Sequence, residues 1–314
     1  MNKPKKSVIS IGIPCYNEEP NVKRTYEALR QTLQKNKKYT YEFIFVDNGS
    51  KDNTKEEVKK IAIKDKRVIG VFLSRNFGPE ASGQAALDTS LGDAFVMYEA
   101  DMQDPPDLIL KFIKKWEEGY KVVVGVRNKI DDNPLMTIVR RMYYKTFRAI
   151  SNIDVPVNAG SFGLIDRKAA DVIKKMSEKY RFFRGLRAWV GFKSEYVGYQ
   201  RRKRMHGKSS YSFFDYIKHA ERSFFGFSYL PLDIIVYTGI FLVAVSFTFI
   251  VSYLVWTFFY GKYIDGSVAI LLSIIFLGGV QLLAISIIGK YIQVIVEETK
   301  RRPVYVIDEI VNKK

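Results

Sequence analysis

Two long segments without a charged residue lie near the C-terminus and restrict the fold more than any other feature of this chain. The first covers residues 234–261 and the second covers residues 266–289. A helix needs about 20 apolar residues to cross the hydrocarbon core of a bilayer. The pattern therefore predicts a hairpin of two transmembrane helices, at residues 232–260 and 266–289, rather than two buried helices of a soluble core.

Positive charges flank these segments and indicate their orientation. The chain has 50 Lys and Arg against 33 Asp and Glu, a net charge of +17, which is typical of proteins that bind nucleic acid or an anionic membrane. The link between the segments holds one Lys and one Asp, whereas basic residues gather outside them, at Arg201, Arg202, Lys203, Arg204, Lys208, Lys218, Arg222, Lys290, Lys300, Arg301 and Arg302. By the positive-inside rule we expect both termini in the cytoplasm, and a membrane rather than nucleic acid as the partner.

The hairpin divides the rest of the chain into three predicted parts. Residues 1–200 form a cytoplasmic domain, residues 201–231 a basic segment at the membrane surface, and residues 290–314 a cytoplasmic tail. Residues 135–150 and 211–229 mix aromatic and aliphatic side chains with Lys and Arg, which favours interfacial helices lying on the bilayer; packing on the cytoplasmic domain is the alternative. The single cysteine excludes a disulfide scaffold and a multi-cysteine zinc site, and the presence of only two histidines argues against a His-rich metal site.

Strands and helices alternate through residues 7–200, which predicts an α/β fold with a mostly parallel sheet covered on both faces. The expected strands are residues 8–13, 41–46, 68–73, 94–98 and 121–126. Polar residues follow three of them, at Asn17 and Glu18, at Asp47 and Asn48, and at Asp101, Gln103 and Asp104. Ligands of such sheets bind beyond the carboxyl ends of the strands. No glycine-rich phosphate loop is present, so a metal held by carboxylate is the expected substitute.

Five sequence motifs together resemble glycosyltransferase family 2, whose catalytic domain has the Rossmann-like GT-A fold. The motifs are residues 14–18 (PCYNE), 46–50 (VDNGS), 74–78 (SRNFG), 101–106 (DMQDPP) and the block from Tyr199 to Tyr211. They are most similar to the polyprenyl-phosphate branch, which includes dolichyl-phosphate mannose synthases and bacterial undecaprenyl-phosphate glucosyltransferases. The resemblance covers nearly the whole chain, the two-span tail included.

The resemblance implies transfer of a sugar from a nucleotide diphosphate, expected to be UDP, to polyprenyl phosphate. A single displacement at the anomeric carbon would invert its configuration. It also implies the cytoplasmic (inner) membrane of a bacterium, a product used for cell-envelope glycans such as lipopolysaccharide, and a homo-oligomer, a tetramer in this family. A processive polysaccharide synthase is the alternative enzyme, but the chain lacks the Gln-x-x-Arg-Trp motif of that class and has too few spans. A non-catalytic membrane scaffold or nucleotide sensor is the second alternative.

The metal is expected at Asp101 and Gln103, because oxygen ligands suit Mg²⁺ or Mn²⁺ and the donor diphosphate can fill other positions. In the other interpretation, Asp101 and Asp104 only cap the helix that begins near Pro105. Glu99 stands where the family has the first Asp of Asp-x-Asp, and we count it with Asp101 among the catalytic candidates. The nucleotide is expected at Pro14, Tyr16, Asn17, Glu18, Asp47 and Ser50, although residues 47–50 alone would also suit a plain turn.

The acceptor phosphate is expected to meet cationic side chains, because guanidinium groups pair with phosphate oxygens two at a time. The candidates are Arg127, Arg201, Arg204, Lys208 and Ser209, with the three arginines also counted as catalytic. Their alternative is a basic cluster that attracts anionic lipids. Ser161 and Gly163 replace an Asp and an Arg of the family pattern, and Ser210 replaces a Lys, which leaves sugar identity and acceptor alignment open.

Overall fold

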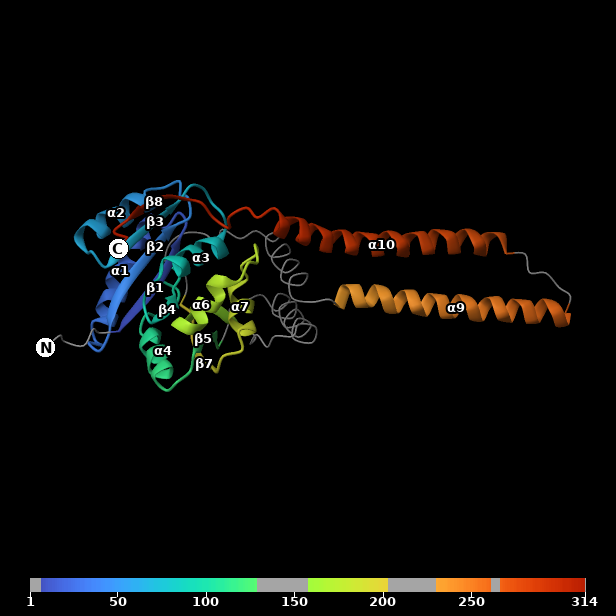
Figure 1. The fold of residues 1–314 in the computed structure, drawn as a ribbon, viewed down its shortest axis with the longest axis horizontal. Coiled ribbons are helices and arrows are strands. Elements are labelled where there is room, and N and C mark those ends of the chain that lie inside the picture. Colours follow the sequence, from blue (N-terminus) through green and yellow to red (C-terminus); the bar gives the residue numbers. More distant parts are fainter. Residues whose placement is uncertain (1–6, 129–157, 203–229, 261–265, 314) are drawn as a thin grey trace. The chain divides into compact units, whose positions relative to one another are not determined.

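The computed structural model describes residues 7–128, 158–202, 230–260 and 266–313. They divide into a unit built around a sheet and a unit of two long helices (Figure 1). The predicted interfacial helices at residues 135–150 and 211–229 lie outside the described residues, as do Arg204, Lys208, Ser209 and Ser210.

One eight-stranded sheet forms the first unit, in the order β7-β5-β6-β4-β1-β2-β3-β8. The strands β1, β2, β3, β4, β5 and β7 run parallel, while β6 and β8 run antiparallel to their neighbours. The mostly parallel α/β fold is therefore confirmed. The strands are β1 (Val8–Cys15), β2 (Thr40–Asp47), β3 (Val68–Leu73), β4 (Ala94–Met97), β5 (Val122–Arg127), β6 (Ala159–Asp166), β7 (Ser194–Tyr199) and β8 (Ile307–Val311).

Helices connect these strands and lie against the sheet (Figure 1). Val22 and Leu29 of α1 are fully buried in the same core as Ile11 of β1 and Phe43 of β2, so each apolar helix face is removed from water. The helices of this unit are α1 (Glu19–Leu33), α2 (Thr54–Lys64), α3 (Pro79–Thr89), α4 (Leu108–Glu117), α6 (Arg167–Lys175) and α7 (Phe183–Trp189).

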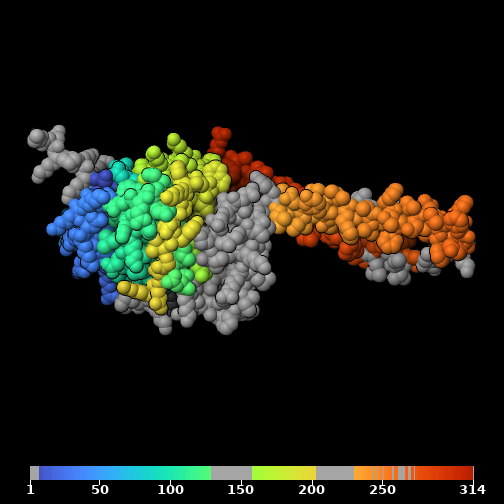
Figure 2. All heavy atoms as spheres, turned by 90° about the horizontal axis from the view of Figure 1, so that it is seen from below, coloured from blue at the N-terminus to red at the C-terminus, as the bar shows by residue number. Residues whose placement is uncertain are grey.

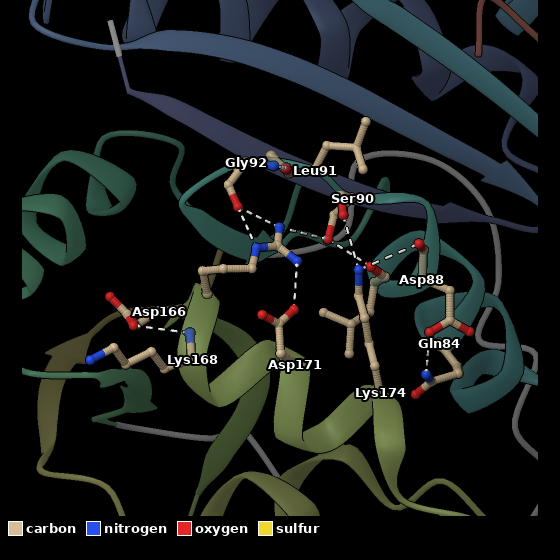
Figure 3. Close-up of polar contacts among 12 residues, drawn as sticks. Gln84, Asp88, Ser90, Leu91, Gly92, Asp166, Lys168, Asp171 and Lys174 are labelled. Carbon is tan, nitrogen blue, oxygen red and sulfur yellow. Dashed lines mark hydrogen bonds and ion pairs between the residues drawn. The ribbon is translucent and has the colours of Figure 1, made fainter. Parts of the chain in front are cut away.

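Polar contacts fasten α6 to the turn that precedes β4, as Figure 3 shows. The Arg167 Nε donates to the carbonyl of Gly92 at 2.7 Å, and the Lys174 Nζ donates to the carbonyl of Ser90 at 3.0 Å. Asp166 caps the helix by accepting from the Lys168 amide at 3.0 Å. The Arg167 and Lys174 bonds satisfy carbonyl groups of the turn, the Asp166 cap satisfies an amide of the helix, and together they fix α6 against the sheet.

The last strand, β8, was not anticipated from the sequence, which led us to expect only a tail. It pairs antiparallel with β3, Val311 opposite Gly70 and Ile307 opposite Leu73. The Asn312 Nδ2 donates to the carbonyl of Val68 at 3.0 Å, and Lys59 forms an ion pair with Glu309 at 2.7 Å. The C-terminal segment of the chain thus adds the last strand to a sheet whose other strands all lie within residues 8–199.

The second unit consists of α9 (Leu230–Tyr260) and α10 (Ser267–Thr299). Two stretches, Leu230–Tyr260 and Ser273–Thr299, are long and apolar enough to cross a membrane. Their large side chains are exposed, Phe258 by 83% and Phe249 by 72%, and Figure 2 shows α9, in orange, with its side chains at the surface. Helix α10 continues to Thr299, ten residues beyond the uncharged segment that ends at Gly289.

Candidate active site

The strand directions bring the predicted site residues to one edge of the sheet. Asp47 ends β2 and pairs in register with Cys15 at the end of β1, while the Tyr98 amide, just after β4, donates to the carbonyl of Gly12. Arg127 ends β5 and is in register with Tyr199 at the end of β7. Because these strands are parallel, their carboxyl ends share an edge, which is where ligands of such sheets bind.

The loops after β1 and β2 are joined by hydrogen bonds from polar side chains. The Asn17 amide donates to the Ser50 Oγ at 2.8 Å, and the Lys51 amide donates to the Asn17 Oδ1 at 2.8 Å. The Glu18 amide donates to the Thr54 Oγ1 at 2.9 Å. Asn17 takes a left-handed conformation with φ of 54°, which Asn tolerates better than most residues. Four predicted nucleotide residues, Asn17, Glu18, Asp47 and Ser50, therefore lie on two connected loops, beside the half-buried Pro14 and Tyr16.

Asp47 is the most enclosed carboxylate of these loops, with 2% of its surface exposed. It accepts hydrogen bonds from the amide and the hydroxyl of Ser50. Burial raises the pKa of the Asp47 carboxyl, and the Ser50 bonds partly offset that rise. An acceptor held in this way suits recognition of an N–H group on a ligand.

Arg201 holds together the carboxylates that follow β4. Its Nη2 lies 2.7 Å from the Glu99 Oε2 and 3.3 Å from the Asp101 Oδ2, and its Nε lies 3.3 Å from the Asp104 Oδ1. The Asp101 and Asp104 side chains are only 6% and 1% exposed. Burial and the two neighbouring aspartates raise the pKa of Glu99, and Arg201 and Arg127 oppose this rise. The structure thus brings together three catalytic candidates, Glu99, Asp101 and Arg201.

Asp104 and Tyr199 belong to this cluster, although neither is among the catalytic or binding candidates named from the sequence. The Tyr199 hydroxyl donates to the Asp104 Oδ1 at 2.6 Å, and the Tyr98 hydroxyl donates to the Asp104 carbonyl at 2.7 Å. The Arg127 Nε donates to the Tyr199 oxygen at 3.4 Å. A buried Asp is costly unless it is paired. The sequence signal that could have identified Asp104 is its position among the polar residues after β4.

The cap interpretation of Asp101 and Asp104 does not hold. Helix α4 begins at Leu108 with Asp107 at the N-cap position, whereas Asp104 bonds to Tyr199. The Asp101 Oδ1 accepts from the Gln103 amide at 3.1 Å, which orients the carboxylate within its own turn. Both side chains are therefore directed to the cluster around Arg201.

The donor set fits a hard divalent cation only if a ligand completes it. Asp101 and Gln103 offer oxygen atoms of the kind that Mg²⁺ and Mn²⁺ prefer. The Asp104 Oδ2 is buried and has no hydrogen-bond partner among the described residues. Within those same residues, no three His, Cys, Asp or Glu side chains are arranged to hold a metal by themselves. Such partial sites are usual for Mg²⁺, which takes its remaining ligands from substrate phosphates and water.

Gln103 also ties the turn after β4 to the chain after β7. The Arg202 amide donates to the Gln103 carbonyl at 2.9 Å, and the Gln103 Nε2 donates to the Arg202 carbonyl at 3.3 Å. These two bonds hold the chain next to Arg201 against the turn that carries Asp101 and Asp104. The fold therefore places Arg201 near these carboxylates, in addition to the attraction between their charges.

The Val123 carbonyl and Arg187 together leave no space for a side chain at position 163. A Cβ added to Gly163 would lie 2.5 Å from the Val123 carbonyl oxygen and 2.7 Å from the Arg187 Nη1. The buried Arg187 donates to the carbonyls of Gly160 and Ser161, at 3.0 and 3.4 Å. Burial and the neighbouring Arg184 lower the pKa of Arg187 to about 10. Gly163 stands where the family pattern has an Arg, and the guanidinium of Arg187, from α7, lies beside it.

Comparison with known proteins places the chain in a family. The family model "Glycosyl transferase family 2" matches residues 10–174. The chain is 38% identical over 305 residues to CsbB of Bacillus subtilis (strain 168), named as a glycosyltransferase, covering 97% of this chain and 92% of the relative. It is 34% identical over 300 residues to the bactoprenol glucosyl transferase of Shigella phage SfX, covering 95% and 98%. It is 33% identical over 303 residues to the prophage bactoprenol glucosyl transferase homolog of Escherichia coli (strain K12), covering 96% and 99%. The chain belongs to glycosyl transferase family 2.

Proposed function

We propose that the protein transfers a sugar from a nucleotide diphosphate, UDP in our proposal, to a polyprenyl phosphate such as undecaprenyl phosphate. The observation that carries the proposal is the cluster of Glu99, Asp101 and Arg201, which lies at the same sheet edge as Asp47. It puts acidic groups that suit a metal-bound diphosphate beside a guanidinium that suits a phosphate. The bactoprenol glucosyl transferases to which the chain is similar support this acceptor.

Each group in the site has a separate task in this reaction. Asp47, Asn17 and Ser50 would hold the nucleotide, and Asp101 with Gln103 would hold Mg²⁺ or Mn²⁺. The cation would supply charge that stabilises the departing nucleoside diphosphate.

The acceptor needs alignment more than activation. A phosphate monoester has a second pKa of about 6 and is mostly dianionic at neutral pH. A strong base is therefore not required to deprotonate the acceptor. Its oxygen would bond to the anomeric carbon as the bond from that carbon to the diphosphate breaks, which inverts the configuration. Arg127 and Arg201 would orient the acceptor phosphate and balance its charge. Arg204, Lys208 and Ser209, which lie outside the described residues, stay candidates for the same task.

The two long helices are proposed as a membrane hairpin, with the catalytic unit on the cytoplasmic face of the bacterial inner membrane. Strand β8 supports an even number of crossings, because it follows α10 and yet belongs to the sheet built before α9. Basic residues at both outer flanks of the hairpin support the cytoplasmic side. The homotetramer and a role in lipopolysaccharide or other envelope glycans stay predictions.

The test uses the full chain in nanodiscs with undecaprenyl phosphate and a panel of radiolabelled nucleotide sugars. We expect a lipid-linked monosaccharide with one donor, dependent on Mg²⁺ or Mn²⁺ and suppressed by EDTA. Asp101→Asn should lower kcat by at least about 100-fold, since it removes charge that acts on the leaving group. Asp107→Asn, at the exposed start of α4, is the matched control and should retain activity. Undiminished turnover by Asp101→Asn would overturn the metal assignment.

A further inference from the structure

The role proposed for Arg201 differs from the contacts that Arg201 makes in the structure. Its guanidinium is expected to meet the acceptor phosphate, yet in the structure it is engaged by Glu99, Asp101 and Asp104. Its closest contacts come from the Nη2, which lies between the Glu99 Oε2 and the Asp101 Oδ2. The side chain is 22% exposed, so it has a path toward solvent.

A divalent cation on the Asp101 Oδ2 would compete with Arg201, which contacts that oxygen in the structure. Mg²⁺ binds carboxylate oxygen at about 2.0–2.1 Å, and the Asp101 Oδ2 already has the Arg201 Nη2 at 3.3 Å. Two cationic groups on one carboxylate oxygen also repel each other, more strongly in a partly buried site than in water. A cation bound at this oxygen would therefore push the guanidinium away from Asp101.

The neighbours of Arg201 in the chain are held by hydrogen bonds, so only the Arg201 side chain has to move when the guanidinium is released. On one side, the Tyr199 hydroxyl is bonded to Asp104 at 2.6 Å. On the other, Arg202 and Gln103 exchange two hydrogen bonds. Neither contact involves the Arg201 guanidinium, so its release requires only a change of side-chain rotamer.

We propose that Arg201 occupies the place of the divalent cation in the ligand-free enzyme, and that cation binding at Asp101 releases it to the acceptor phosphate. This inference rests on the proposed function. It makes binding of the cation and binding of the lipid phosphate mutually favourable, because each occupies one partner of the same ion pair. Such a coupling is reciprocal by linkage: the lipid phosphate strengthens cation binding by the factor by which the cation strengthens lipid binding.

The experiment measures Mn²⁺ binding by electron paramagnetic resonance, on the full chain in nanodiscs with saturating UDP and no sugar donor. We expect undecaprenyl phosphate to raise the Mn²⁺ affinity of the wild type by about 5- to 150-fold, the usual range of such couplings, and undecaprenol, which lacks the phosphate, to leave it unchanged. Arg201→Gln should bind Mn²⁺ more tightly than the wild type without lipid phosphate, and should lose the response to it.

Two further variants separate this role from simple electrostatics. Arg202→Gln removes the same charge one residue away, from a side chain that is exposed, and should keep the full response to undecaprenyl phosphate. Arg201→Lys keeps the charge beside the carboxylates, so it guards against loss of folding, and should respond more weakly than the wild type because it lacks the planar guanidinium.

The proposal would be overturned if undecaprenyl phosphate left the Mn²⁺ affinity of the wild type unchanged. It would also be overturned if undecaprenyl phosphate raised the Mn²⁺ affinity of Arg201→Gln as much as that of the wild type. Asp101→Asn distinguishes this failure from failure of the proposed function. If Asp101→Asn abolishes Mn²⁺ binding while Arg201→Gln keeps the response, only the role of Arg201 is wrong. If Asp101→Asn binds Mn²⁺ like the wild type, the proposed cation site is wrong and this proposal falls with it.

Discussion

Gly163 has no space for a side chain, and this residue shows how closely β5 and α7 pack against β6. Replacing it by Ala would place the Cβ 2.5 Å from the backbone oxygen of Val123, which cannot move without disturbing β5. We expect Gly163→Ala to lower the free energy of unfolding by about 1–3 kcal/mol, measured as a fall in Tm by differential scanning fluorimetry.

Gly160 on the same strand offers a matched control. A Cβ there would lie 3.2 Å from the Arg127 Nη2, the far end of a flexible side chain. Gly160→Ala should therefore keep its Tm near that of the wild type, and any loss of transfer activity would come from displacement of Arg127. Equal Tm losses in the two variants would contradict the steric clash assigned to Gly163.

Helix α6 depends on Asp166, which ends β6 and caps the helix. Its carboxylate accepts from the Trp116 Nε1 at 2.7 Å, the Lys121 Nζ at 2.9 Å and the Lys168 amide at 3.0 Å. Burial raises the pKa of Asp166, but these bonds outweigh it and lower the pKa overall. We expect Asp166→Asn to cost about 2 kcal/mol at neutral pH, the range for hydrogen bonds to a charged group.

The pH dependence of this loss follows from the lowered pKa. Asp166 stabilises the fold fully above its unfolded pKa of about 3.9, and this contribution disappears as pH falls through the folded pKa. The Tm gap between wild type and Asp166→Asn should therefore be constant near neutral pH and narrow below about pH 4. Asp171→Asn is the control, since the exposed Asp171 pairs with Arg167 at 3.4 Å (Figure 3) and should change Tm little. A gap that widens in acid would contradict the assignment.

Strand β8 protects the edge of the sheet at β3, whose six residues are all buried. Without β8, the N–H and C=O groups of β3 would be open to pairing with another chain. Removing residues 303–314 should cost about 3 kcal/mol or more, with Tm falling by about 2–4 °C for each kcal/mol, and should produce aggregates in size-exclusion chromatography. Removing only the last two lysines should do neither. A monodisperse, equally stable truncated protein would show that β8 is dispensable.

At the scale of the whole molecule, the orientation of the hairpin is open to a labelling experiment. The single native cysteine, Cys15, is 2% exposed, and burial together with Asp47, Glu18 and Asp52 raises the pKa of its thiol, so it should not react in the folded protein. Tyr260→Cys, at the end of α9, should react with a membrane-impermeant maleimide in intact bacterial cells. Lys300→Cys, just after α10, should react only after permeabilisation. The reverse pattern would place the catalytic unit outside the cytoplasm.

The sequence alone determined the class of fold, the hairpin and the edge of the sheet that carries the polar residues. These features follow from local patterns: uncharged length, alternation of strands and helices, and the rule that parallel strands end together. Five motifs in order also indicated the family. Asp101, Asp47 and Asn17 could be named as site candidates because each lies at the end of a strand or within a few residues beyond it.

Only the tertiary structure decided which of these side chains meet. Arg201 is about 100 residues away from Glu99, Asp101 and Asp104, and their contacts depend on how β7 aligns beside β5 across the sheet. The same holds for Tyr199 on Asp104, for Arg187 against Gly163, and for β8 beside β3. No local periodicity encodes such pairings, because strand register and packing between distant segments are set by the whole core. For that reason the sequence identified Asp101 and Arg201 separately, and only the fold showed that they form an ion pair.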